Sequence, residues 1–180
     1  LGNHLASYKL GNMYSNGEHY LQDYTEAEKW YRMSAEQGYA KAQYNLGLVY
    51  DNGVGVLQDY AEALKWFRLA AEQGYALGQF SLGSMYVNGT GVLKDFSEAV
   101  KWWRVAAEQG YYKAQFGLGL IYNDGDSGLQ DYTEAEKWYR LSAEQGYAKA
   151  QNKLGNLYQY VFKDYMKANK WYQLGANQGF

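Results

Sequence analysis

The chain has 180 residues, a formal net charge of −2 and aromatic side chains at 18% of its positions. This length can bury a continuous core, while the near-neutral charge argues against nucleic acid or an anionic membrane as the main partner. The sequence has no apolar run of about eighteen residues that could span a membrane, and the absence of cysteine excludes disulfides and thiolate metal sites.

The chain is predicted to be a series of helix pairs that repeats along its length. An Asp-aromatic pair at Asp23-Tyr24 opens a helical stretch, and a Gln-Gly pair closes it at Gly38. This pattern returns three times with a 36-residue period, and a fifth copy is three residues shorter. The copies are expected at roughly 2–37, 38–73, 74–109, 110–145 and 146–180. Such a period is typical of a stacked repeat array.

The first helix of each copy is predicted from stretches such as residues 40–50. Its expected core residues are Ala42, Leu46, Val49 and Tyr50. Gly47 lies inside this helix although glycine costs about 1 kcal/mol relative to alanine. Glycine returns at this position in every copy, so we expect the backbone of a neighbouring helix to approach closely there. A glycine-rich loop that begins at Asn52 leads to the second helix.

The second helix is best defined in the second copy, at residues 59–74. Its apolar stripe comprises Tyr60, Ala63, Phe67, Ala70 and Ala71. Asp59 stands at the N-cap, and Glu62 is expected to complete a capping box. Gly74 should end the helix in the left-handed conformation. A tryptophan series follows the repeat and is expected to be structural: Trp30, Trp66, Trp102, Trp138 and Trp171.

One pattern therefore combines all these positions. In the second copy it comprises Ala42, Leu46, Gly47, Tyr50, Gly53, Gly55, Val56, Asp59, Tyr60, Ala63, Trp66, Phe67, Ala70, Ala71 and Gly74. This pattern resembles the Sel1-like repeat, a relative of the tetratricopeptide repeat, over nearly the whole chain. The resemblance implies an all-α fold, a right-handed α/α solenoid of five helix-turn-helix repeats. Because both ends fall at repeat boundaries, we expect residues 1–180 to form a single domain that is part of a longer array.

No group of side chains in the sequence predicts catalysis, a cofactor or a metal site. The two histidines, His4 and His19, lack the spacing of a metal-binding pair. The carboxylates recur with the repeat, which a capping role explains, and no serine lies in a nucleophile motif. The segment 124–128 begins like a calcium loop but lacks the distal glutamate, so it is expected to be a turn.

The face of the first helix opposite its core is the candidate binding surface. One position on this face is aromatic in four copies and becomes an amide in the fifth: Tyr8, Tyr44, Phe80, Phe116 and Asn152. By the resemblance, this face would line a concave groove. The candidate partner-binding residues are Tyr8, Tyr44, Leu48, Leu77, Phe80, Ser84, Lys113, Phe116, Leu120, Lys149, Asn152, Lys153 and Asn156. Alternatively, the rings pack against neighbouring first helices and widen the core.

The C-terminal end of this surface is polar and basic. Four of its residues share one helical face at i, i+3, i+4 and i+7: Lys149, Asn152, Lys153 and Asn156. We hypothesise an extended ligand with an apolar middle and an acidic end beside the fifth repeat. The alternative is a solvated basic patch.

The resemblance implies a non-catalytic scaffold or adaptor that binds a protein or peptide, in a bacterial envelope, periplasmic or secreted setting. Nucleic acid and direct membrane insertion are not expected. Two other functions stay open at this point. One is a carbohydrate- or cell-wall-associated accessory protein with a glycan-stacking groove, and the other is a structural spacer in a larger protein.

Overall fold

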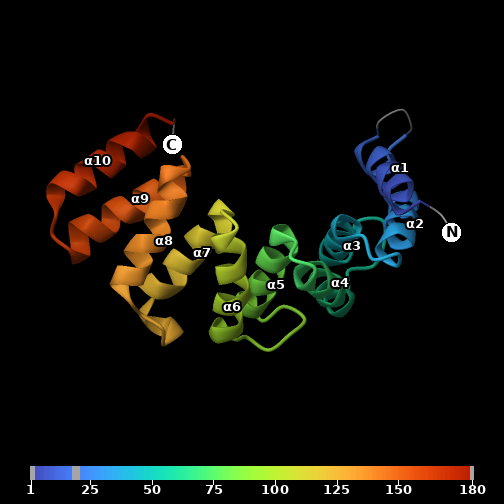
Figure 1. Ribbon diagram of the computed structural model, residues 1–180, viewed down its shortest axis with the longest axis horizontal. Coiled ribbons are helices and arrows are strands. Elements are labelled where there is room, and N and C mark those ends of the chain that lie inside the picture. The colour runs from blue at the N-terminus through green and yellow to red at the C-terminus, as the bar shows by residue number, and fades with distance from the viewer. Residues whose placement is uncertain (1–2, 18–20, 179–180) are drawn as a thin grey trace. The chain divides into compact units, whose positions relative to one another are not determined.

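The computed structural model describes residues 3–17 and 21–178 (Figure 1). The predictions that concern residues 1–2, His19 with its loop neighbours, and residues 179–180 lie outside this part of the chain. Within the described residues the secondary structure is helical throughout, and the all-α prediction is confirmed.

Ten α-helices follow one another along the described residues. The first helices of the repeats are α1 (His4–Asn16), α3 (Ala40–Asn52), α5 (Ala76–Asn88), α7 (Tyr112–Asn123) and α9 (Ala148–Asn156). The second helices are α2 (Tyr24–Ala35), α4 (Tyr60–Glu72), α6 (Phe96–Glu108), α8 (Tyr132–Glu144) and α10 (Tyr165–Ala176). A 3-10 turn, η1 (Gly125–Ser127), follows α7, and a π-helical turn, η2 (Leu157–Val161), follows α9.

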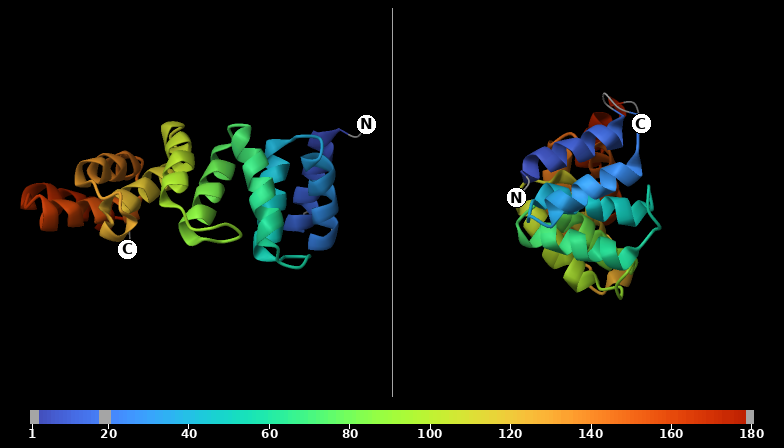
Figure 2. Two further views of the ribbon diagram at one scale, coloured as in Figure 1. Left: turned by 90° about the horizontal axis from the view of Figure 1, so that it is seen from below. Right: turned by 90° about the vertical axis from the view of Figure 1, so that its right-hand side faces the viewer.

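The helices form two compact units, Leu1–Trp102 and Trp103–Phe180, with the boundary inside α6. In the first unit, α1 packs on α2, α2 on α3, α3 on α4 and α4 on α5. In the second unit, α7 packs on α8, α8 on α9 and α9 on α10. Figure 2 shows successive helices of each unit side by side. Helices thus pack on their sequence neighbours, as in a stacked repeat.

The core of the helix pairs consists of alanine, aliphatic and aromatic residues, as the periodicity predicts. In α4, Ala63, Phe67, Ala70 and Ala71 are buried, whereas Tyr60 is 40% exposed, so its predicted core position is wrong. Tyr60 occupies the first turn of α4, directly after the N-cap, where the helix end is open to solvent. In α3, three of the four expected core residues are buried and the fourth, Tyr50, is half-buried.

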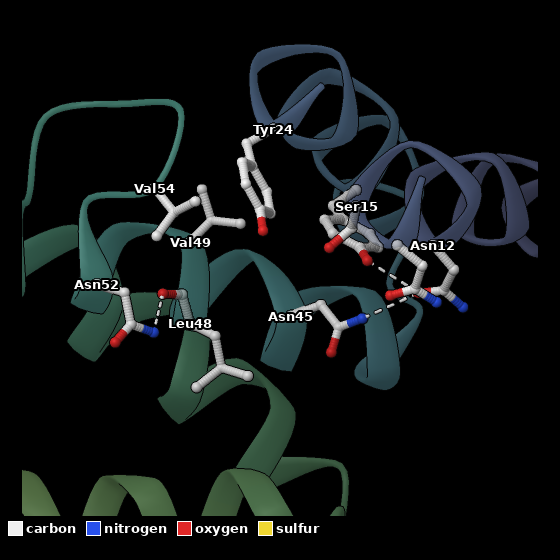
Figure 3. A pocket seen from close by; sticks show the side chains of 10 residues that line it. Asn12, Ser15, Tyr24, Asn45, Leu48, Val49, Asn52 and Val54 are labelled. Carbon is white, nitrogen blue, oxygen red and sulfur yellow. Dashed lines mark hydrogen bonds between the residues drawn. The ribbon is translucent and has the colours of Figure 1, made fainter. Parts of the chain in front are cut away.

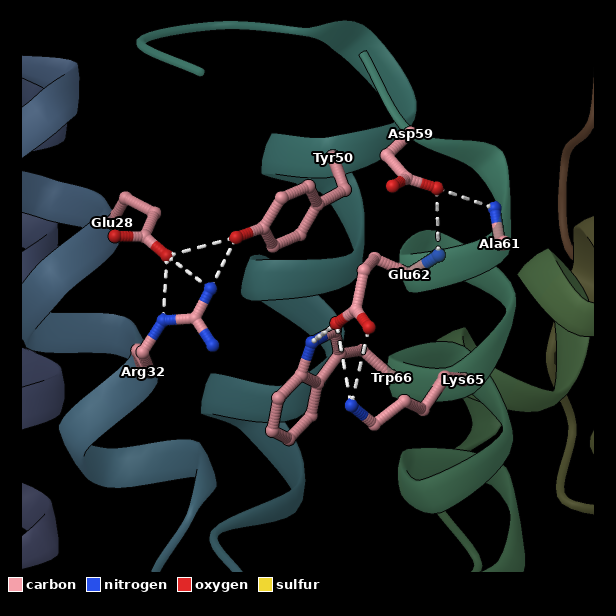
Figure 4. A network of polar contacts seen from close by, with 8 residues as sticks. All are labelled: Glu28, Arg32, Tyr50, Asp59, Ala61, Glu62, Lys65 and Trp66. Carbon is pink, nitrogen blue, oxygen red and sulfur yellow. Dashed lines mark hydrogen bonds and ion pairs between the residues drawn. The ribbon is translucent and has the colours of Figure 1, made fainter. Parts of the chain in front are cut away.

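The N-cap prediction for the second helices is confirmed, but the capping box is wrong. Asp59 accepts hydrogen bonds from the N–H groups of Ala61 and Glu62 at 2.9 and 3.1 Å. The Asp59 N–H, which a capping box would direct to Glu62, donates instead to the Tyr50 carbonyl at 3.0 Å. The Glu62 carboxylate accepts from Trp66 Nε1 at 3.0 Å (Figure 4). This glutamate therefore fixes the tryptophan ring rather than the helix start.

A second polar cluster in Figure 4 links α2 to α3. The Arg32 guanidinium donates to Glu28 at 2.8 Å and to the Tyr50 hydroxyl, which itself donates to Glu28 at 3.1 Å. Arg140, Glu136 and Tyr158 form the corresponding cluster in the second unit. Both ion pairs are partly shielded from water, which strengthens them relative to a fully exposed pair.

The mid-helix glycines lie at close contacts, although the contacting group differs from the expected one. A Cβ atom built on Gly47 would lie 2.6 Å from Cδ1 of Phe67 in α4. The same holds for Gly119 and Tyr139 in the second unit, at 2.3 Å. The ring of the paired second helix, rather than a neighbouring backbone, therefore occupies the space that glycine leaves open.

A buried glutamine in the first helix joins three successive helices. Gln43 Nε2 in α3 donates to the carbonyl of Ala35 in α2 at 3.2 Å. Its Oε1 accepts from Nε2 of Gln73, directly after α4, at 2.6 Å. Gln115 has the same two contacts in the second unit, with Ala107 and Gln145. Both buried amides therefore form hydrogen bonds with a backbone carbonyl and with a second glutamine side chain, which replace the hydrogen bonds to water that packing removes.

In three repeats a tyrosine covers the mid-helix glycine, and its hydroxyl is paired in two of them but not in the third. The Tyr31 hydroxyl donates to Asn12 at 2.9 Å, and the Tyr172 hydroxyl donates to Asn156 at 2.7 Å. In the fourth repeat the corresponding residue is Leu120, and the buried Tyr139 hydroxyl has no hydrogen-bond partner among the described residues. Burial, with a smaller effect from the charge of Asp124, raises the pKa of Tyr139 well above its usual value.

Tyr139→Phe is therefore expected to stabilise the second unit by about 1 kcal/mol in urea denaturation, because it removes an unpaired buried hydroxyl. Above pH 10 the unfolded chain releases the Tyr139 proton while the folded chain keeps it. The free energy of unfolding of the wild type should then fall with pH by about 1.4 kcal/mol per unit from this group, and the variant should lack that slope.

Tyr31→Phe is the matched control, because it removes a hydroxyl that has a partner, Asn12. It should destabilise the first unit by about 1 kcal/mol. Equal losses for the two substitutions would show that the Tyr139 hydroxyl is also satisfied in solution.

Candidate partner-binding face

The first helices of each unit carry the candidate surface, on α1, α3 and α5 in the first unit and on α7 and α9 in the second, and we call it the A-face of that unit. Its predicted aromatic residues are half-buried. The Tyr44 ring lies 5.8 Å from the Phe67 ring and 5.5 Å from the Tyr75 ring, between centroids. Tyr8 contacts Tyr31 and Tyr39 in the same way, at 6.2 and 5.1 Å. These rings thus pack on an aromatic residue of the paired second helix and on the N-cap tyrosine that precedes the next first helix.

The other predicted residues of the A-face differ in exposure. Leu48, Leu77, Phe80 and Ser84 are half-buried, and Ser84 Oγ donates to the Phe80 carbonyl at 2.8 Å. In the second unit Phe116 is half-buried, with its ring 5.9 Å from Tyr139 and 5.1 Å from Tyr147 between centroids. Lys113 and Leu120 are exposed.

In the first unit, a cavity of about 320 Å³ lies between α1, α2 and α3 (Figure 3). Its lining comprises Asn12, Ser15, Asn16, Tyr24, Tyr31, Asn45, Leu48, Val49, Asn52 and Val54. Asn45 Nδ2 donates to Asn12 Oδ1 at 3.3 Å, which joins α3 to α1. We call it the amide cavity, since amide and hydroxyl groups predominate and no carboxylate, lysine, arginine or histidine lines it.

In the second unit, a cavity of about 250 Å³ is lined by Phe116 of α7 and by Ala148, Lys149, Asn152 and Lys153 of α9. We call it the basic cavity. Four of its five lining residues are among those that the sequence pattern selects, and the helical spacing places them together as expected. Asn156, the fourth residue of the predicted basic set, lies one turn further along and donates to Asn152 Oδ1 at 3.4 Å.

The charge of the basic cavity is not neutralised by the described part of the chain. Lys149 and Lys153 are exposed, and neither ammonium forms an ion pair with a described residue. In contrast, Lys137 of α8 pairs with Glu134 at 3.1 Å, and Lys167 of α10 pairs with Asp164 at 3.1 Å. The lysines at the cavity are thus available to an anionic group of a ligand.

The described residues contain no group of three or more His, Cys, Asp or Glu side chains that could hold a metal ion. In the turn at η1, Asp124 Oδ1 accepts from the Asp126 N–H at 3.1 Å, so this carboxylate shapes the loop locally. None of the helices in residues 3–17 and 21–178 is both long and apolar enough to cross a membrane.

Comparison with known families identifies the repeats. The family model of the Sel1 repeat matches residues 4–39, 40–75, 76–111, 113–147 and 148–180. The chain belongs to the Sel1 repeat family. Each matched repeat begins two or three residues after the predicted one. Sel1 repeat proteins are generally non-catalytic scaffolds for protein interactions.

Solved Sel1 repeat structures are similar to this chain. The protein c5321, a protective antigen of uropathogenic Escherichia coli strains, is 41% identical with a TM-score of 0.93, over 98% of this chain and 38% of that one. A Sel1 repeat protein from Oxalobacter formigenes is 37% identical with a TM-score of 0.88, over 98% of this chain and 72% of that one. The solenoid prediction is confirmed, and this chain spans little more than a third of the length of c5321. No curated protein matches the chain.

The amide cavity and Ala148 were not predicted as parts of a site. Amides such as Asn45 and Asn52 of α3 resemble ordinary turn and surface residues in a sequence, and only the packing of α1 and α2 beside α3 adds the rest of the cavity lining. Ala148 resembles the small core residues of every first helix. No spacing rule distinguishes an alanine that lines a cavity from one that fills a core.

Proposed function

We propose that this Sel1 repeat chain is a non-catalytic scaffold that binds a protein or peptide through the A-face, with an acidic part of the ligand beside α9. The basic cavity supports this most directly, because it joins an aromatic ring to two lysines that have no ion-pair partner among the described residues. Exposed Leu120 and half-buried Phe116 supply the neighbouring apolar surface. Aromatic anchors beside charged groups are typical of peptide-binding sites.

The Lys149→Ala/Lys153→Ala variant tests this function. Peptides selected from a displayed random library against the 180-residue chain should bind this variant about tenfold more weakly than the wild type at low ionic strength. The difference should shrink as salt is added, because exposed charges are screened. Fluorescence anisotropy with labelled selected peptides provides the measurement.

A charge-matched control is Lys137→Ala/Lys170→Ala, which removes two lysines from the second helices α8 and α10. Selected peptides should bind this control like the wild type. Equal binding to all three proteins, or a library that yields no binder, would contradict the proposal. Binding of a cell-wall oligosaccharide, in the absence of any peptide binder, would favour the glycan-binding alternative. The uncharged amide cavity offers hydrogen-bonding groups for such a ligand.

A further inference from the structure

We propose that a small cavity between α3, α4 and α5 binds the side-chain ammonium group of a lysine of the partner, with Asp51 as its counter-ion. We call it the acidic cavity. This inference rests on the proposed peptide-binding function, and it names a ligand group that the A-face of the first unit recognises.

The acidic cavity has a volume of about 100 Å³ and lies one repeat after the amide cavity. Each residue that lines it stands 36 positions after a residue that lines the amide cavity, so both cavities occupy the same place between successive repeats. Their chemistry differs at Asp51, which is the one ionisable acid in either described lining. The other repeats have uncharged residues at this position: Ser15, Val87, Asn123 and Gln159.

Asp51 carries a half-buried carboxylate that has no partner in the described part of the chain. Gln58 Nε2 donates to the backbone carbonyl of Asp51 at 2.6 Å, and not to the carboxylate. Burial raises the pKa of the Asp51 carboxyl, and no neighbouring positive charge lowers it. In contrast, the Glu62 carboxylate of α4 pairs with Lys65 at 3.2 Å. A cation in the cavity would therefore supply the charge that Asp51 lacks.

The polar groups of the acidic cavity favour a hydrogen-bond donor. The Ser84 hydroxyl donates its single proton to the Phe80 carbonyl at 2.8 Å, so its oxygen can only accept a further hydrogen bond. The ionised Asp51 carboxylate also only accepts. A lysine ammonium has three N–H donors and no acceptor, which matches both groups. A ligand carboxylate or carbonyl would meet acceptors at both.

The rest of the cavity fits the aliphatic end of a lysine side chain. Phe67 and Met85 are buried and supply apolar surface for its methylene groups. The cavity is smaller than the roughly 150 Å³ that accommodates benzene in an engineered protein, so a straight chain fits better than a ring. Calcium would require about six to eight oxygen ligands, usually with several carboxylates, whereas the described lining contains one carboxylate.

Small probes test the acidic cavity against the isotope-labelled 180-residue chain by NMR titration. The first is n-butylammonium, which reproduces the end of a lysine side chain, and the others are n-butanol, n-butylguanidinium and calcium chloride. We expect n-butylammonium to shift the amide signals of Asp51, Ser84 and Thr90 and to bind at least about tenfold more tightly than n-butanol. Tighter binding of n-butylguanidinium or calcium at these residues would overturn the assignment to lysine.

The role of the charge is tested with Asp51→Asn, which keeps the shape of the side chain, and with Asp51→Ser, which introduces the residue of the first repeat. Both should weaken n-butylammonium binding at least about tenfold at low salt and leave n-butanol unchanged. Glu72→Gln removes an exposed carboxylate of α4 and is the charge-matched control, which should change neither.

The partner's lysine is tested with the library-selected peptides. Replacing the lysine of a selected peptide by norleucine should weaken its binding to the wild type about tenfold, and should have no effect on its binding to Asp51→Asn. Selected peptides that lose nothing when every lysine is replaced would contradict the inference.

Equal affinity for n-butylammonium and n-butanol, signal shifts that map away from α3 and α5, or n-butylammonium binding that Asp51→Asn leaves unchanged would each overturn the acidic cavity as an ammonium site. If selected peptides still depend on Lys149 and Lys153 in that event, the scaffold function stands and only this inference is wrong. If neither the selected peptides nor n-butylammonium binds, both proposals fail.

Discussion

Gly47→Leu is expected to destabilise the first unit by more than about 3 kcal/mol. Helix propensity alone would predict the opposite, a stabilisation by roughly 1 kcal/mol, because leucine is the better helix former. A Cβ at this position would already lie 2.6 Å from Cδ1 and Cε1 of Phe67. Phe67 is 1% exposed, so its ring has no solvent to move into. Accommodating the leucine requires α3 and α4 to separate, which would be measured as a lower midpoint in urea denaturation.

The matched control is Gly175→Ala in α10, another helical glycine. A Cβ there would meet its nearest neighbours at 3.8 Å, an ordinary van der Waals distance. Gly175→Ala should therefore be neutral or slightly stabilising, while Gly47→Ala is destabilising. Pairing Gly47→Ala with Phe67→Leu should recover part of the loss, because the smaller side chain vacates the ring positions. A melting temperature for Gly47→Leu near that of the wild type would show that no such clash exists.

Local features of the fold could be predicted from the sequence because few distant groups influence them. Asp59 caps the N-terminus of α4, and Gly74, with φ of 83°, follows its C-terminus in the left-handed conformation. Each depends only on residues in the adjoining turn of the helix. The buried stripe of α4 follows from helical spacing, and only Tyr60 departs from it. Helical spacing was also sufficient to bring Lys149 and Lys153 to one cavity.

Features that depend on competition between distant groups could not be predicted. Glu62 and Asp59 have the spacing of a capping box. However, the Asp59 N–H donates to the Tyr50 carbonyl, and the Glu62 carboxylate accepts a hydrogen bond from Trp66. Gln43 has the polarity of a surface residue, yet packing of α2 and α4 around α3 buries it. The volume of the basic cavity likewise depends on how α7 and α9 pack, which no local pattern contains.

The tryptophan series is expected to be energetically unequal although it repeats in every copy. Trp66 is 5% exposed and Trp138 is 3% exposed, whereas Trp30, Trp102 and Trp171 are half-buried. Trp66 belongs to the core cluster that α2 and α3 share, with Tyr31 of α2 and Leu46 of α3 among its members. It therefore joins the second repeat to the first, rather than only filling its own pair.

Trp66→Ala should consequently cost about 3–5 kcal/mol, the range for a large buried aromatic residue. Trp66→Phe retains most of the apolar contact but loses the 3.0 Å bond to Glu62, and it should cost less, with the lost bond itself contributing about 1 kcal/mol. Trp30→Ala is the control for a half-buried tryptophan and should be clearly milder than Trp66→Ala. Urea denaturation followed by circular dichroism would rank the three. Equal losses for Trp66→Ala and Trp30→Ala would mean that Trp66 does not couple the two repeats, since the shared core cluster is what sets these two tryptophans apart.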